Sequence, residues 1–252
     1  MWFLLIAIIA TASVVSAAFV VPGLLRSVLF SSRPDFALKA SPASSVMLTG
    51  NEEDLVVSVQ SLDNFSGIVS LKAISSASDL NVALLSYAGI SPDAIPLGHA
   101  QNLTLSIRAF SWGNYTITLI ATSGQLYHST KVFVVVQSIV FSATPAAITL
   151  PQGSIASSQI VFSSRNGLSG NISLTTSIYH PGEINPGLQA TVSPSWVVLS
   201  SSGTVTVTLT IQASSSAQSW LVGFSACPVN FPTLNGGDTS MCVGHNFDVI
   251  IS

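Results

Sequence analysis

The sequence predicts an α+β fold, in which one long apolar α-helix at the N-terminus precedes two tandem all-β modules. Three observations lead to this prediction. Residues 1–25 contain no ionisable side chain. From Asp35 onward, apolar and hydroxyl-bearing residues alternate in short runs, which is the period of a half-buried strand. A run that begins at Ser61 recurs in similar form from Ser164, which indicates two copies of one unit.

The apolar start is expected to form a helix over residues 1–31. At about 1.5 Å per residue, its first twenty-five residues span roughly 37 Å, more than the ~30 Å hydrocarbon core of a bilayer. Exposing its large side chains to water would cost on the order of tens of kcal/mol, so the helix is buried on every side, in lipid or against copies of itself. The side chains expected at this buried surface are Trp2, Phe3, Leu4, Leu5, Ile6, Ile8, Ile9, Val14, Val15, Phe19, Val20, Val21, Leu24 and Leu25.

Two features shape the path of this helix. Pro22 removes a helical hydrogen bond and Gly23 follows it, so a kink is expected there. Arg33 precedes Pro34 and is therefore steered out of the helical region. Residues 31–35 are expected to be the exit from the helix.

The rest of the chain is predicted to consist of strands. The clearest alternating runs are residues 56–62, 103–110, 115–122, 131–136 and 204–211. Clusters of Gly, Asn and Ser separate them at the spacing found in β-sandwiches.

The internal repeat divides this β-rich region in two. SLDNFSGIVSL at residues 61–71 aligns with SRNGLSGNISL at residues 164–174. Further landmarks that align are Ser41-Pro42 with Thr144-Pro145, Leu48 with Leu150, and Ser91-Pro92 with Ser193-Pro194. The units are residues 35–137 and 138–252, each close to the ~100 residues of an immunoglobulin-like sandwich. Almost no linker separates them, which implies a stiff end-to-end arrangement.

The two cysteines, Cys227 and Cys242, flank a Gly-rich stretch and have no CxxC pair or His/Cys cluster beside them. We predict a disulfide that stabilises the fold by roughly 3 kcal/mol. The alternative is two buried free thiols. A disulfide implies an oxidising compartment outside the cytosol.

Four sequons of the form N-x-[ST] begin at Asn64, Asn102, Asn114 and Asn171. Some matches arise by chance in a chain so rich in Ser and Thr. Together they favour an exported, N-glycosylated protein.

The charge pattern excludes one class of function. Only 7% of the residues are charged, and seven Lys and Arg are scattered along a chain of formal net charge −3. No basic stripe is available to neutralise phosphates, so nucleic acid is not an expected partner.

We expect neither an enzyme, a cofactor nor a metal site, because the sequence contains no motif that gathers titratable groups. Glu52-Glu53-Asp54 is interpreted as a solvated loop before a strand, with cation binding as the alternative. The histidines, interpreted as surface or hydrogen-bonded residues, are His99, His128, His180 and His245. Trp112, Trp196 and Trp220 are interpreted as core or sheet-packing residues, with a carbohydrate platform as the alternative.

The apolar start is compatible with two fates. Val15-Ser-Ala17 is a fair cleavage site for a secretory signal. Such a signal also requires a positively charged start, and no Lys or Arg precedes Arg26. The missing charge is explained if a short basic leader before Met1 has been removed.

In its bare apolar start and late Pro22, the segment over residues 1–31 resembles the mature N-terminus of type IV pilins, archaeal adhesive pilins and archaellins. Leu5 stands where bacterial pilins have a glutamate, which fits the archaeal branch better. The β modules are similar to Ser/Thr-rich immunoglobulin-like modules of prokaryotic surface proteins.

The resemblance implies a structural subunit of an extracellular filament that serves adhesion, surface contact or motility. The apolar helices would be inserted in the cell membrane before assembly and would then bundle with identical subunits at the filament axis. The alternative is a membrane-anchored surface glycoprotein whose immunoglobulin-like pair acts as a spacer or binds a ligand. A secreted solute-binding or accessory protein is the third possibility.

Overall fold

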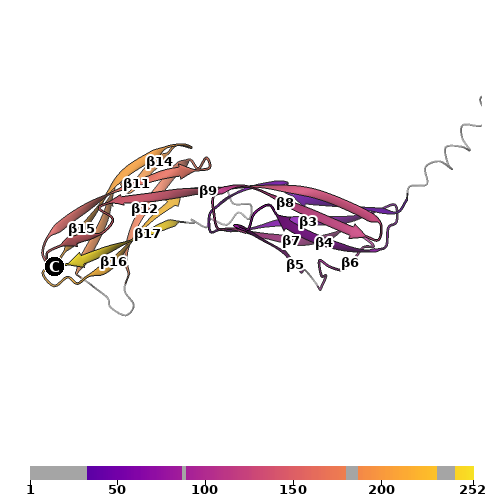
Figure 1. The fold of residues 1–252 in the computed structure, drawn as a ribbon, viewed down its shortest axis with the longest axis horizontal. Coiled ribbons are helices and arrows are strands. Elements are labelled where there is room, and N and C mark those ends of the chain that lie inside the picture. The colour runs from indigo at the N-terminus through magenta and orange to yellow at the C-terminus, as the bar shows by residue number, and fades with distance from the viewer. Residues whose placement is uncertain (1–32, 87–88, 180–186, 232–241) are drawn as a thin grey trace, which may run out of the picture.

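The computed structural model describes residues 33–86, 89–179, 187–231 and 242–252. This part of the chain consists of β-strands, turns and loops, without an α-helix, and is therefore all-β (Figure 1). The predicted α+β class with a long helix is wrong for it, because each described segment follows the two-residue period of a strand. The predicted helix over 1–31, with its fourteen assembly side chains, Pro22 and Gly23, lies outside the described residues.

The first module contains nine strands, the last of which continues into the second module. They are β1 (Asp35–Ser41), β2 (Ser44–Leu48), β3 (Glu52–Leu62), β4 (Ile68–Ser75), β5 (Leu80–Leu85), β6 (Ile95–Pro96), β7 (Gln101–Ala109), β8 (Gly113–Ser123) and β9 (Leu126–Thr144). One sheet has the order β1-β3-β7-β5, and β9, β8, β4 and β6 form the facing sheet, with β2 paired in parallel to β9.

The second module repeats this plan. Its further strands are β10 (Ile148–Leu150), β11 (Ile155–Arg165), β12 (Gly170–Tyr179), β13 (Leu188–Ser193), β14 (Trp196–Leu199), β15 (Thr204–Ala213), β16 (Trp220–Pro228) and β17 (Val243–Ile251). The order β9-β11-β15-β13 matches β1-β3-β7-β5, and β10-β17-β16-β12-β14 matches β2-β9-β8-β4-β6. Both modules thus have the strand arrangement of an immunoglobulin-like sandwich.

Strand β9 belongs to both modules. Its first part pairs with β8 as far as Val136, and its second part pairs with β11 from Ser138 onward. It is therefore the last strand of one sandwich and the first strand of the next. Figure 1 shows it running along the length of the two modules. A single extended strand takes the place of a linker.

Each module has its own apolar core. In the first, the largest fully buried side chains include Phe36, Met47 and Leu105, and in the second they include Phe162 and Phe224. The burial follows from the alternation: along β15, TVTVTLTI directs Val207, Leu209 and Ile211 inward and leaves the threonines outside. Each fully buried aliphatic side chain contributes about 1.5–3 kcal/mol.

The repeated sequence forms the same turn twice. Ser61 Oγ donates to the carbonyl oxygen of Phe65 at 2.7 Å, and Ser164 Oγ donates to that of Leu168 at 2.7 Å. Both turns place two consecutive residues in the left-handed region, Asp63-Asn64 and Asn166-Gly167. Asn, Asp and Gly adopt that region at low cost, which explains these residue types at both copies of the turn.

Candidate functional site

The joint between the modules is built around Asn166. This residue lies in the turn that joins β11 to β12, with φ of 54°. Its Nδ2 donates to the carbonyl oxygens of Gly113 at 2.8 Å and Val136 at 2.9 Å, and to Oδ1 of Asn114 at 3.1 Å. In return, Gln137 Nε2 donates to the carbonyl oxygen of Asn166 at 3.2 Å. A turn of the second module is thus hydrogen-bonded to two strands of the first.

Apolar and aromatic contacts reinforce the joint. Leu48, at the end of β2, is 1% exposed and belongs to the core of the second module, although its strand pairs within the first. The next residue, Thr49, donates from its backbone N–H to the carbonyl oxygen of Gln137 at 2.9 Å. The Arg165 guanidinium lies over the Trp112 ring at 5.9 Å. These contacts come from both modules and favour one fixed orientation between them.

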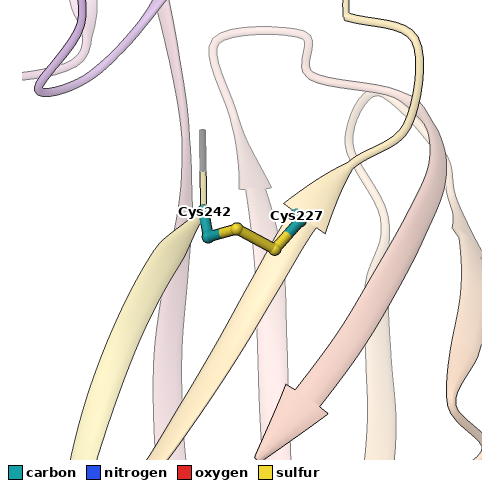
Figure 2. Close-up of a disulfide and its surroundings, with 2 residues drawn as sticks. All are labelled: Cys227 and Cys242. Carbon is teal, nitrogen blue, oxygen red and sulfur yellow. A yellow bond between two sulfur atoms is a disulfide. The ribbon is translucent and has the colours of Figure 1, made fainter. Parts of the chain in front are cut away.

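The predicted disulfide between Cys227 and Cys242 is present (Figure 2). It joins the end of β16 to the residue before β17. In the register of β12 and β16, Cys227 lies opposite Ser173, close to the turn that carries Asn166. The disulfide therefore lies at the joint end of the second module. A disulfide of this kind is typical of secreted and cell-surface proteins.

At the other end of the first module, Asp35 contacts His128. Asp35 Oδ1 lies 2.7 Å from His128 Nε2 and also accepts from the backbone N–H of Phe36 at 2.7 Å. The His128 imidazole and this N–H hold the pKa of Asp35 below its ordinary value of 3.8. Phe36 is fully buried and packs edge-on against the His128 ring at 4.6 Å. The contact fixes the start of β1 against β9.

The four sequon asparagines are all exposed. Asn64 lies in the turn after β3, Asn102 near the start of β7, Asn114 near the start of β8 and Asn171 near the start of β12. The side chain of Asn114 also takes part in the joint, since its Oδ1 accepts from Asn166. Exposure is what attachment of a glycan requires, and modification itself stays a prediction.

The structure corrects the interpretation of the acidic cluster. Glu52, Glu53 and Asp54 are the first residues of β3 and do not form a loop. Glu53 is 2% exposed because it is in phase with the core residues Leu55 and Val57. Glu52 Oε1 accepts from Ser106 Oγ at 2.5 Å. The burial of Glu53 was detectable in the sequence from its phase in the alternation.

The structure places the three tryptophans in different surroundings. Trp220 is 7% exposed and lies in the second core, whereas Trp112 and Trp196 are 49% and 62% exposed. Trp112 extends from the loop before β8 and Trp196 lies on the outer face of β14, so neither packs in a core.

The three described histidines do not come together. His99 is exposed, His128 is bound to Asp35, and His245 packs against Phe247 at 4.9 Å. His180 lies outside the described residues. Within the described ranges, no three His, Cys, Asp or Glu residues approach closely enough to hold a metal ion.

An open hollow of about 400 Å³ lies where β13 begins and β15 ends. Its lining consists of Gly187, Leu188, Gln189, Gln212, Ala213, Ser214 and Ser216. None of these side chains titrates near neutral pH, so the hollow offers no acid, base or charged nucleophile.

In the part of the chain that the structure describes, there is also no helix long and apolar enough to cross a bilayer.

Neither protein-family models nor curated proteins give a match to the chain. Solved structures give several. The D00-D0 domain of intimin is 15% identical with a TM-score of 0.41, over 85% of this chain and 99% of that one. Domains 5-6 of the S-layer protein SbsC are 15% identical with a TM-score of 0.31, over 87% and 100% of the two chains.

The secreted serine protease VesC from Vibrio cholerae is 9% identical with a TM-score of 0.31, over 73% of this chain and 48% of the protease. The chain thus spans about half the length of that protein. At identities and TM-scores this low, none of these likenesses assigns an activity, a substrate or a partner to the chain.

Proposed function

We propose that the chain is a structural subunit of an extracellular filament. Its apolar N-terminal segment, residues 1–25, would be held in the cell membrane before assembly and then gathered with identical segments at the filament axis. The two sandwiches would form the outer layer, available for adhesion, surface contact or motility. Any N-linked glycans at the exposed sequons would lie on that layer.

One observation carries this proposal: an apolar segment that water cannot accommodate is joined to two modules that share a strand. The segment requires continuous burial, because exposing its side chains would cost more than the ~5–15 kcal/mol by which a domain is stable. The shared β9 and the Asn166 contacts hold the modules as one elongated unit. Such a unit is suited to repetitive packing, because it presents its surfaces in one fixed geometry.

The length of the apolar segment supports a second candidate. Twenty-five residues are enough to span a bilayer as a helix. The second candidate is therefore a membrane-held surface glycoprotein, with the sandwich pair as a spacer or ligand-binding unit. In that case the segment stays in lipid and no fibre forms.

Substitutions within the segment separate the two candidates. Leu5→Arg or Ile9→Asp places a charge where identical segments would pack, so we expect loss of surface fibres while the sandwiches stay folded. Fibres are counted by electron microscopy of sheared cell-surface material, and folding is followed by the thermal unfolding of purified variants. Normal fibre numbers in both variants would refute the role given to the segment.

A further inference from the structure

The outer face of one sheet in the first module gathers apolar and basic side chains. We name it the lysine face and define it by Val46, Lys72, Ile74, Lys131 and Phe133. The register places them together, since Lys131 and Ile74 both pair with Thr118 of the central strand β8. Phe133, Ile74 and Val46 are 55%, 53% and 39% exposed.

The lysine face has no acid of its own. The outward residues of β2, β4, β8 and the first half of β9 include Lys72 and Lys131 but neither Asp nor Glu. In the part of the chain that the structure describes, the contact between an acidic and a basic side chain is that of Asp35 with His128. Lys72 and Lys131 therefore have no acidic partner among the described residues. Exposed apolar side chains that gather in one patch with polar groups at its rim are typical of an interaction surface.

The second module presents the complementary chemistry. On the outer face of its β17-β16-β12-β14 sheet, Asp248 is exposed, and no described outward residue is Lys or Arg. Leu221 pairs directly with Asp248 and is 42% exposed, while Ile250, two residues further along β17, is 49% exposed. We name Leu221, Asp248 and Ile250 the Asp248 face.

These two faces belong to different layers of the molecule. Because β9 joins β8 in one module and β11 in the other, one eight-stranded sheet continues through both modules. The lysine face is the outer surface of this sheet in the first module. The Asp248 face is the outer surface of the five-stranded sheet that packs against it in the second module. The two faces therefore lie on different sheets and in different modules of one chain.

We infer that the lysine face of one copy docks on the Asp248 face of a second copy. This contact rests on the proposed function and specifies how neighbouring subunits pack outside the apolar segments. In a filament each pair of neighbours makes this contact once, between the lysine face of one copy and the Asp248 face of the next, so the contact is heterologous and repeats from copy to copy.

A zero-length carbodiimide cross-linker tests this contact on assembled full-length protein. The expected product is a peptide pair that joins Lys72 or Lys131 to Asp248. Only a link between two copies supports the contact. Mixing isotopically labelled and unlabelled subunits before assembly identifies it as intermolecular. Fibres that give only other cross-links would overturn the proposed contact.

Charge reversal provides the second test. The double variant Lys72→Glu with Lys131→Glu is expected to reduce fibre yield at least about tenfold, since it places like charges opposite Asp248. Adding Asp248→Lys should restore the yield. Lys39→Glu is the matched control, because Lys39 is exposed on β1 in the other layer of the first module.

The possible results of this test are distinguishable. Fibres that are unaffected by the double reversal would overturn the docking while leaving the proposed function intact. A wild-type chain that forms no fibres would overturn both. If the double variant assembles normally but loses binding to an acidic polysaccharide, the lysine face serves an anionic polymer, and docking of a second copy is refuted. The unfolding midpoints of all variants show whether the sandwiches are folded.

Discussion

Asn166 Nδ2 donates to the carbonyl oxygen of Val136 at 2.9 Å, so a turn of the second module is tied to the strand that ends the first. Val136 is the last residue of β9 to pair with β8, and the strand pairs with β11 only two residues later. The hydrogen bond therefore lies at the point where β9 changes module. It identifies the joint as a packed contact between the sandwiches.

Replacing Asn166 should loosen the joint without unfolding either sandwich. Asn166→Gly keeps the left-handed backbone available but removes the hydrogen bonds that the two Nδ2 protons share among three acceptors, so we expect the free energy of unfolding to fall by about 1–3 kcal/mol. Residual dipolar couplings from the two modules should then no longer fit one alignment tensor. Asp63→Gly, at the matching turn of the first module, is the control and should leave a single tensor. A single tensor in both variants would contradict the role of Asn166.

Neighbouring residues of β2 should report on different modules. Met47 is fully buried in the first core, and Leu48 is buried in the second. Each substitution to Ala should cost about 2–5 kcal/mol, because it leaves a cavity. Hydrogen exchange should accelerate mainly in the first module for Met47→Ala and mainly in the second for Leu48→Ala. Identical exchange patterns would show that Leu48 does not contribute to the second core.

The Asp35–His128 contact predicts how stability depends on pH. Because the folded pKa of Asp35 is lowered from 3.8, its contribution is fully present above that value and is lost as the pH falls through the lower folded pKa. Asp35→Asn should lower the urea midpoint near neutral pH and flatten its decline in strong acid. If the urea midpoint of Asp35→Asn falls at low pH as steeply as that of the wild type, the loss of stability in acid comes from the titration of another group.

Removal of the disulfide should act on the second module. The double substitution Cys227→Ser with Cys242→Ser releases the loop between β16 and β17, and the expected loss of stability is roughly 3 kcal/mol. Thermal unfolding followed by hydrogen exchange should show the loss there and little change around Phe36 in the first core. An equal loss in both modules would indicate that they unfold as one cooperative unit.

The alternation of side chains predicted parts of five strands, β3, β7, β8, β9 and β15. The runs at residues 56–62 and 204–211 correspond to β3 and β15, since a strand buried on one face requires that pattern. The phase of Glu53 also follows from it, but a charge at the edge of a strand was interpreted as solvated. Trp112 was misplaced because an aromatic residue next to a strand pattern fits a loop as well as a sheet.

The shared strand was less accessible to sequence reasoning. Alternation breaks at the joint, where consecutive Ser138 and Ile139 are both buried, and this break is compatible with a tight linker as well as with one continuous strand. Long-range pairing with β8 and β11 decides that this stretch forms one continuous strand and not a linker. The hydrogen bonds of Asn166 depend in the same way on contacts across the repeat, which no local pattern contains.

Electron cryomicroscopy of fibres sheared from the cell surface tests the central claim most directly. The account predicts helical fibres in which residues 1–25 of neighbouring copies are in contact at the axis and the paired sandwiches lie outside. Material recovered only as separate particles from solubilised membranes, with those residues in lipid, would contradict it.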